Sequence, residues 1–373
     1  MHSIWETRGF HRTPHLVVVG AGIVGLFTAL FHKRANPKHH VVVLERGPFP
    51  SGASVKNAGF ACFGSPSELL ADLENEGMDA MLYRVEERWR GLQELRNELG
   101  DAAIGLEGTG GYEIYAPHDH RYTTVAEGFD RLNEALRPIF RRTVFAWSDD
   151  AIPRMGLSGV EHMAKTDLEG PLDTALLMDS LLRKAVSEGV QLRPNSWVTS
   201  IEDGQDHVRV RLRNEGPMIA AQVVVATNGY ATELLPELDV KPARGQVLLT
   251  TPIEGSRLRG TFHYDEGFYY FRDHHGAVLL GGGRNLDIVG ETTTEDSTTP
   301  LIQSELERIL REVIMPGRTF GIAQRWSGIM GMGGSKTPII EHVSPRVVAA
   351  VRLGGMGVAI GIRVARKAAA LVQ

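Results

Sequence analysis

The most telling residues lie near the start of the chain, where Gly20–Gly25 reads Gly-Ala-Gly-Ile-Val-Gly. In such a turn Gly20 permits the tight bend, Gly22 lets a pyrophosphate approach the backbone, and Gly25 lets a helix pack closely on a strand. Glu45 follows Gly25 by 20 residues, where a carboxylate can accept hydrogen bonds from both hydroxyls of a ribose. The glycine turn and the acid together predict a bound dinucleotide.

The segments around this turn are those that would position it. Residues 15–19 read as a short buried strand, 23–33 carries apolar residues at helical spacing, and 41–44 is a second apolar strand. The N-terminus of the helix offers unpaired N–H groups and the positive end of its dipole to the phosphates. This order of strand, turn, helix and strand predicts a Rossmann-like unit with a parallel sheet.

Composition excludes several classes of protein. The chain has 373 residues, 42% of them hydrophobic, which predicts about two domains. Its net charge of −5 argues against nucleic acid or an acidic membrane surface as a main partner. No apolar run reaches ~18 residues, so no integral membrane segment is expected. The 14 histidines show no metal-ligand spacing, and the one cysteine, Cys62, suits a reducing, cytoplasmic compartment.

Two kinds of region alternate along the rest of the chain. From residue 244 the runs 246–250, 267–271 and 277–280 read as strands without a helix between them, which indicates an antiparallel sheet. A second glycine loop, 354–357, opens a final helix. Another amphipathic helix is predicted over residues 173–188, with four side chains facing inward: Leu176, Leu177, Leu181 and Val186.

Four blocks together resemble the D-amino-acid-oxidase-like family of FAD-dependent oxidoreductases. They are 17–46, 51–59 (SGASVKNAG), 223–230 with 241–247 (VVVATNGY, KPARGQV), and 325–340 leading into 353–361 (RWSGIMGMGGSKTPII, LGGMGVAIG). The resemblance implies an α/β (α+β) fold. A Rossmann-like FAD-binding domain of the glutathione-reductase-like FAD/NAD(P)-binding superfamily is joined to a substrate domain with a mixed or antiparallel sheet. The expected FAD-binding ranges are 1–64, 151–240 and 321–373, and the substrate-binding ranges are 65–150 and 241–320.

The resemblance also implies which residues hold FAD. The glycine turn takes the pyrophosphate, Glu45 the ribose, and the last helix gives N–H groups to the N1–C2=O edge of the flavin. Gly328 stands where sarcosine oxidases have the cysteine that bonds to the flavin, so the FAD is expected to be non-covalent. The expected set is Gly20, Gly22, Ile23, Gly25, Glu45, Arg46, Ala53, Ser54, Lys56, Asn57, Ala58, Gly59, Val198, Thr227, Asn228, Gly229, Gly355, Met356, Gly357 and Val358.

The implied reaction oxidises a C–N bond. A hydride leaves the carbon next to a neutral amine for the flavin N5, and the imine then hydrolyses. The catalytic candidates are Tyr269, Tyr270, Arg272 and Lys56. Because side chains alternate along a strand, one tyrosine faces the core and the other the pocket, and the sequence leaves open which. Arg272 is either a partner for a substrate carboxylate or part of a surface ion pair.

Departures from the family affect the substrate and the electron acceptor. Met330 stands where glycine-oxidase-like members have the arginine that binds the substrate carboxylate, so an amine or a larger N-substituted amino acid is favoured over a simple amino acid bound in the usual way. Arg325 and Met330 are expected to line the substrate pocket. The possible substitutes for the missing arginine are Arg325, Arg272, Arg244 and Arg284.

The acceptor, O2 or another molecule, stays open. Strand 277–281 lacks the lysine that sarcosine-oxidase-like members use with O2. Lys56 either supplies that positive charge or pairs with a neighbouring carboxylate. Two other functions compete: oxidation of a 2-hydroxy acid, with His263, His274 or His275 as the base, and flavin binding without turnover.

Overall fold

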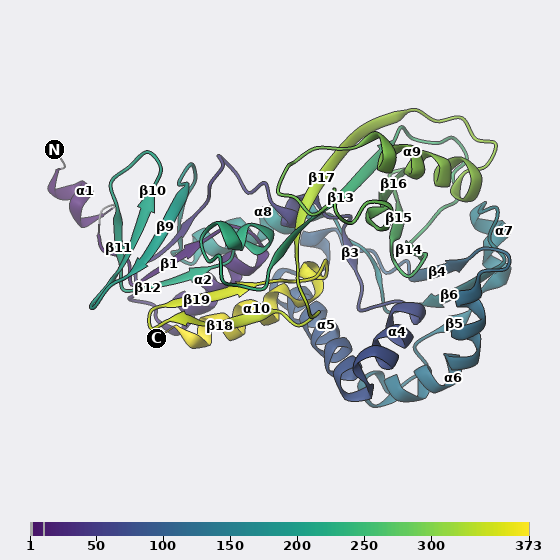
Figure 1. Ribbon diagram of the computed structural model, residues 1–373, viewed down its shortest axis with the longest axis horizontal. Helices are drawn as coiled ribbons and strands as arrows, with labels where there is room; N and C mark the ends of the chain where they lie inside the picture. Colours follow the sequence, from purple (N-terminus) through teal and green to yellow (C-terminus); the bar gives the residue numbers. More distant parts are fainter. Residues whose placement is uncertain (1–2, 10–11, 373) are drawn as a thin grey trace. The chain divides into compact units, whose positions relative to one another are not determined.

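The computed structural model describes residues 3–9 and 12–372. The chain forms two units that are interleaved along the sequence, one of residues 1–55, 175–243 and 330–373, and the other of 56–174 and 244–329. The expected domain ranges differ from these units in a few segments. Residues 56–64, 151–174 and 321–329 belong to the second unit, and 241–243 belong to the first. Figure 1 shows the elements of both units.

The first unit is built on a six-stranded sheet in the order β18-β19-β12-β1-β2-β8. All neighbours are parallel except β18 and β19, so the predicted parallel sheet is confirmed. Its elements are α1 (Ile4–Arg8), β1 (Leu16–Val19), α2 (Ile23–Ala35), β2 (Val41–Leu44), α8 (Thr174–Ser187), β8 (Gln191–Arg193), β9 (Val198–Asp203), β10 (Val208–Leu212), β11 (Met218–Ala220), β12 (Gln222–Val225), η3 (Asn228–Glu233), β18 (Ile339–Ser344), β19 (Val347–Val351) and α10 (Gly357–Leu371).

Valines explain how this unit packs. Val17 and Val19 of β1 share a buried cluster with Val208 and Val210 of β10, so the antiparallel sheet β9-β10-β11 covers one face of the parallel sheet. Helices α2 and α10 lie side by side (Figure 1), and a Cβ at Gly361 would come within 2.8 Å of the Ile23 side chain. The end of α10 that begins at Gly357 is thereby fixed relative to α2.

The predicted inward face of α8 is partly wrong. Leu177 and Leu181 are buried as expected, but Leu176 and Val186 are 43% and 52% exposed. The buried stripe is instead completed by Met178 and Ala185, which lie on the same side of the helix as Leu177 and Leu181.

The second unit contains an eight-stranded sheet in the order β17-β13-β16-β15-β14-β4-β6-β5. From β13 to β5 all neighbouring strands are antiparallel except β14 and β4, so the antiparallel region predicted after residue 244 is confirmed. Its elements are β3 (Phe60–Ala61), α4 (Pro66–Glu76), α5 (Met78–Leu99), η1 (Ala102–Ile104), β4 (Gly111–Tyr115), α6 (His120–Phe140), β5 (Ala146–Trp147), η2 (Asp149–Ala151), α7 (Ile152–Met155), β6 (His162–Thr166), β7 (Gly170–Pro171), β13 (Lys241–Thr250), β14 (Thr261–Tyr264), β15 (Tyr269–His274), β16 (Ala277–Gly282), η4 (Arg284–Leu286), α9 (Pro300–Ile309), the π-helical turn η5 (Leu310–Ile314) and β17 (Ile322–Met332).

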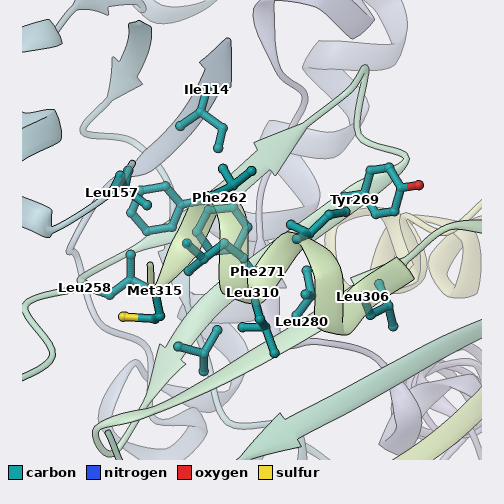
Figure 2. Close-up of a cluster of buried hydrophobic side chains, with 14 of the residues drawn as sticks. Ile114, Leu157, Leu258, Phe262, Tyr269, Phe271, Leu280, Leu306, Leu310 and Met315 are labelled. Carbon is teal, nitrogen blue, oxygen red and sulfur yellow. The ribbon is translucent and has the colours of Figure 1, made fainter. Parts of the chain in front are cut away.

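One face of this sheet packs against α9 and η5. Figure 2 shows Phe262, Phe271 and Leu280 of the strands together with Leu306 and Leu310 of the helical segment in one buried cluster. The rings of Phe262 and Phe271 stack with centroids 4.7 Å apart. The opposite face of β15 is therefore the one available for chemistry. The short helix α3 (Ala53–Lys56) joins the two units along the chain, and no helix among residues 3–9 and 12–372 is long and apolar enough to cross a membrane.

A buried carboxyl group holds the segment that follows β3. Glu169 is 7% exposed, and its Oε1 accepts hydrogen bonds from the N–H groups of Phe63 (2.7 Å) and Gly64 (3.4 Å). Burial raises the pKa of Glu169 to about 8, although these two hydrogen bonds oppose the shift. In an unfolded chain the pKa of a glutamate is about 4.3.

We therefore expect the stability of the protein to fall as the pH rises from about 5 to about 8. The folded form keeps the proton of Glu169 in that window while the unfolded form loses it, which costs up to ~1.4 kcal/mol per pH unit. Glu169→Gln keeps an acceptor for Phe63 and Gly64 but cannot ionise, so its unfolding free energy, measured in denaturant across this range, should vary less with pH. Glu341→Gln, at an exposed position, is the control and should keep the wild-type slope. An equal slope in Glu169→Gln would contradict the expectation.

Candidate functional site

The glycine turn of the first unit is as tight as its sequence predicts. Gly20 has φ +105°, and a Cβ at Gly25 would lie 1.9 Å from the carbonyl oxygen of Gly20. A Cβ at Gly22 would lie 2.8 Å from Ser54 Oγ, which accepts a hydrogen bond from the N–H of Ile23 at 3.0 Å. Ser54 therefore sits at the start of α2, where an anionic group is favoured.

The carboxylate of Glu45 is fixed beside this turn. It is 9% exposed and accepts hydrogen bonds from the N–H groups of Ala21 and Gly47, both at 3.1 Å. Each carboxylate oxygen has a further lone pair for a hydroxyl donor. The guanidinium of the next residue, Arg46, lies 4.5 Å from the Tyr230 ring centroid and 5.2 Å from that of Trp197. Val198, which follows that tryptophan, is buried at the start of β9.

The segment after β12 contains a buried hydroxyl without a partner. Asn228 adopts φ +47°, and its amide oxygen accepts hydrogen bonds from the N–H groups of Arg352 (3.1 Å) and Leu353 (3.2 Å). Asn228 thus ties the segment Thr227–Gly229 to the second glycine loop. Thr227 Oγ1 is buried and has no hydrogen-bond partner in the described part of the chain. Because Thr227 Cγ2 lies 3.6 Å from where a Cβ of Gly20 would be, this free hydroxyl is next to the glycine turn.

The second glycine loop leads directly into α10. Gly355 has φ +81°, and a Cβ there would lie 3.5 Å from Met330 Sδ. The N–H of Met356 donates a hydrogen bond to the carbonyl of Leu353 at 3.0 Å. The first turn of the helix, Gly357 and Val358, has no acceptor within the helix for its N–H groups. Met330, expected in the substrate pocket, thus packs on the loop that is expected to hold the flavin.

In the second unit, Arg272 clamps the segment Asn57–Gly59. The side chain of Asn57 accepts a hydrogen bond from the N–H of Gly59 at 2.9 Å. Arg272 is 8% exposed, and its Nη1 donates to the carbonyls of Ala58 (3.3 Å), Gly59 (3.1 Å) and Leu172 (2.6 Å). Burial lowers its pKa. Because Arg272 is buried, it does not form the surface ion pair that was one of its two expected roles. Its Nη1 is occupied by backbone carbonyls, and a role of the guanidinium as partner of a substrate carboxylate stays a prediction.

The two tyrosines of β15 face opposite sides of the sheet. Tyr269 is 4% exposed and belongs to the core cluster (Figure 2). Tyr270 lies on the other face, where a Cβ at Gly281 would come within 2.6 Å of its hydroxyl oxygen and where Phe60 meets its ring edge-on at 5.9 Å. Its cross-strand partner is His263, whose ring stacks on Phe60 at 5.4 Å. Burial raises the pKa of both tyrosines to about 12, so both hydroxyls keep their protons at neutral pH.

Lys56 forms an ion pair. Its ammonium contacts the carboxylate of Asp296, which also accepts a hydrogen bond from Ser327 Oγ at 2.8 Å. Of the two alternatives for Lys56, pairing with a carboxylate is the one observed. Sequence reasoning missed Asp296 because it lies in a polar, threonine-rich stretch 240 residues away, without any distinguishing spacing.

The arginines that could replace the missing carboxylate-binding arginine differ in their contacts. Arg244 is buried against Glu291, with two hydrogen bonds of 2.9 Å. Arg325 donates to Gln303 and to Glu307, the latter at 2.6 Å. Arg284 Nε is buried and has no hydrogen-bond partner among residues 3–9 and 12–372.

Other chemistry has little support in the described residues. Across 3–9 and 12–372 no three or more His, Cys, Asp or Glu side chains are arranged to hold a metal ion. Cys62 is buried, and burial raises the pKa of its thiol well above the ordinary value, which disfavours a reactive thiolate. His274 and His275 lie at the β15–β16 turn, at the far end of β15 from Tyr270.

Comparison with known proteins identifies the family. The profile of the DAO family, described as FAD dependent oxidoreductase, matches residues 15–371. The chain therefore belongs to this family of FAD-dependent oxidoreductases, which confirms the resemblance. No curated protein sequence matches the chain.

Solved structures agree in fold. L-proline dehydrogenase from P. horikoshii is 18% identical, with a TM-score of 0.76 over 97% of this chain and 94% of that chain. Iminodiacetate oxidase from Chelativorans sp. BNC1 is 20% identical, with a TM-score of 0.75 over 96% of this chain and 95% of that one. Glycine oxidase from Bacillus cereus ATCC 14579 is 17% identical, with a TM-score of 0.73 over 96% and 95%. At these identities the likeness establishes the fold.

The residues of the first unit fit the cofactor of this family. The glycine turn leaves room that side chains would fill, and the unpartnered hydroxyl of Thr227 lies beside it. A buried hydroxyl without a partner costs ~1–3 kcal/mol, which a hydrogen bond to a ligand would recover.

We expect Thr227→Val to weaken FAD binding while leaving the apoprotein as stable as before or more so. Loss of one hydrogen bond of ~1 kcal/mol corresponds to about a fivefold rise in the dissociation constant of FAD, measured by fluorescence titration of the apoprotein. Thr250→Val is the matched control, because Thr250 Oγ1 accepts a hydrogen bond from the N–H of Val278 at 2.9 Å. That variant should lose stability in the apoprotein. Unchanged FAD affinity in Thr227→Val would argue against this placement.

Proposed function

We propose that the protein oxidises the C–N bond of an amino acid or amine, with FAD held non-covalently. Family membership supports the oxidoreductase activity, and the structural relatives named above act on substrates in which carbon is bonded to nitrogen. FAD, when bound, supplies the acceptor for the hydride that leaves the carbon next to the nitrogen. The remaining steps, imine hydrolysis to a carbonyl compound and release of the nitrogen, need only water.

In this proposal the chain's own residues bind and orient. The glycine turn, Glu45 and Thr227 hold the nucleotide part, and the first turn of α10 presents N–H groups to the flavin edge. The segment Ala53–Gly59 runs along the flavin. The unit of 1–55, 175–243 and 330–373 is accordingly the FAD-binding domain, and the other unit binds the substrate.

The position of Tyr270 supports the proposal that the second unit binds the substrate. It shares one sheet face with Arg272 and the segment at Ala58–Phe60, and its hydroxyl has no hydrogen bond to any described residue. A tyrosine with a pKa of about 12 is a donor, not a base, at neutral pH. It would therefore orient a substrate by hydrogen bonding and by contact with its ring.

Anaerobic reduction of the purified protein tests this function. Amines, N-methyl and D-amino acids, L-amino acids and 2-hydroxy acids are added in turn, and bleaching of the flavin absorbance is recorded. We expect a compound with an oxidisable C–N bond to bleach it, as the structural relatives named above act on such substrates. Of the three histidines considered as base for a hydroxy acid, His274 and His275 lie at the far end of β15 from Tyr270, and the ring of His263 stacks on Phe60. Bleaching by hydroxy acids alone would contradict the proposal, and no bleaching by any compound would favour flavin binding without turnover. Readmitting air then distinguishes O2 from another acceptor, and acid precipitation that releases the flavin would support non-covalent binding.

We further propose that Arg284 binds the carboxylate of an amino-acid substrate, since its Nε is the buried, unpaired donor among the four candidates. A charge-assisted hydrogen bond contributes ~1.5–3 kcal/mol. Arg284→Gln should therefore raise KM for carboxylate-bearing substrates by about tenfold to a hundredfold, with little change for amines that lack the group. Arg284→Lys should recover part of the loss. The control is Arg257→Gln, at an exposed position, and an equal effect on both substrate classes would contradict this role. A cytoplasmic location stays a prediction from the single cysteine.

A further inference from the structure

Three groups of Lys56, its ammonium, its carbonyl and its Cβ, are in contact with other residues. Its ammonium pairs with Asp296, its carbonyl accepts a hydrogen bond from the indole N–H of Trp326 at 3.0 Å, and Gly328 packs so closely that a Cβ there would lie 3.0 Å from Lys56 Cβ. Ser327, between these two β17 residues, donates to the second oxygen of Asp296 at 2.8 Å. One stretch of β17 and one loop carboxylate thus fix both the position and the charge partner of this lysine.

A buried ion pair positions Asp296 in turn. Arg244 and Glu291 are joined by two hydrogen bonds of 2.9 Å, and their side chains are 5% and 1% exposed. Arg244 also donates to Ser297 Oγ at 2.6 Å. The loop is therefore anchored on both sides of Asp296. Since removal of one member would leave a buried charge unpaired, this anchor resists rearrangement.

Asp296 is ionised at neutral pH. Burial raises its pKa, but the hydrogen bonds from Lys56 and Ser327 outweigh this and leave the pKa below its ordinary value. The ammonium of Lys56 consequently faces a carboxylate, and the two charges cancel at the segment Lys56–Gly59.

We propose that Asp296 is a positioning residue, which holds the Lys56 ammonium and cancels its charge where that segment runs along the cofactor. This inference rests on the proposed function, which places FAD along Ala53–Gly59. A net positive charge there would favour the reduced, more negative form of the cofactor, and a net negative charge would disfavour it. The neutral pair therefore keeps the reduction potential between these two extremes.

The reduction potential of the bound flavin tests the proposal without any substrate. The holoprotein is reduced chemically in the presence of a reference dye, and the midpoint potential is read from the two absorbances at equilibrium. We expect Asp296→Asn to raise the potential and Lys56→Met to lower it. The double variant should lie near wild type. The expected size is about a tenfold change in the redox equilibrium constant for each single variant, or about 30 mV for a two-electron couple.

Glu295→Gln is the matched control, because it removes the same charge one residue earlier. The carboxylate of Glu295 has no hydrogen bond or ion pair with any described residue. Its substitution should shift the potential much less than Asp296→Asn. Equal shifts would overturn the inference, since net charge rather than the contact to Lys56 would be responsible.

The Lys56→Met variant distinguishes a failure of the role of Asp296 from a failure of the placement of FAD along Ala53–Gly59. If Lys56→Met lowers the potential while Asp296→Asn leaves it unchanged, the role of Asp296 is wrong and the placement of the cofactor stands. If Lys56→Met itself has no effect, the placement of FAD along Ala53–Gly59 fails. Ser327→Ala, which removes the second contact to Asp296, should shift the potential in the same direction as Asp296→Asn but by less.

Discussion

The buried guanidinium of Arg272 is the interaction on which the candidate site of the second unit depends. It joins the carbonyls of Ala58 and Gly59 to that of Leu172, and the short strands β3 and β7 extend the same connection from Phe60 onward. A buried cation is costly unless it is fully hydrogen-bonded, and here backbone carbonyls provide the partners. Arg272 therefore fixes the segment that precedes β3, a contact that the sequence did not predict.

Two polar residues on that sheet face, Arg272 and Tyr270, differ in their contacts. Arg272 and Tyr270 are two residues apart on β15 and so point to the same side. The Nη1 and Nε of the arginine donate to backbone carbonyls, whereas the hydroxyl of the tyrosine has no hydrogen bond to any described residue. Position on one sheet face thus does not by itself distinguish a residue that holds the backbone from one that is free to meet a ligand, and the hydrogen-bond partners give the further information.

The sequence predicted features that depend on local sterics and failed where distant residues meet. The glycine turn at Gly20–Gly25 follows from space that only glycine leaves, and the loop before α10 from the positive φ of Gly354 and Gly355, and both are found as expected. The sequence could not predict the pair Lys56–Asp296, since its members are 240 residues apart and Asp296 belongs to no motif. Alternation on β15 could show that the two tyrosines face opposite sides, but only the packing of α9 on Tyr269 decides which one is core.

Buried polar atoms without a hydrogen-bond partner indicate where a ligand could bind. Most of the polar side chains expected at the site have partners in the chain, as Glu45, Asn228 and Arg272 do. Thr227 Oγ1 and Arg284 Nε are buried without one. An unmade hydrogen bond costs more than a made one contributes, so a ligand or water molecule that meets such an atom recovers free energy. The first lies beside the glycine turn and the second just beyond β16, and the proposed function accordingly assigns the nucleotide to Thr227 and the substrate to Arg284.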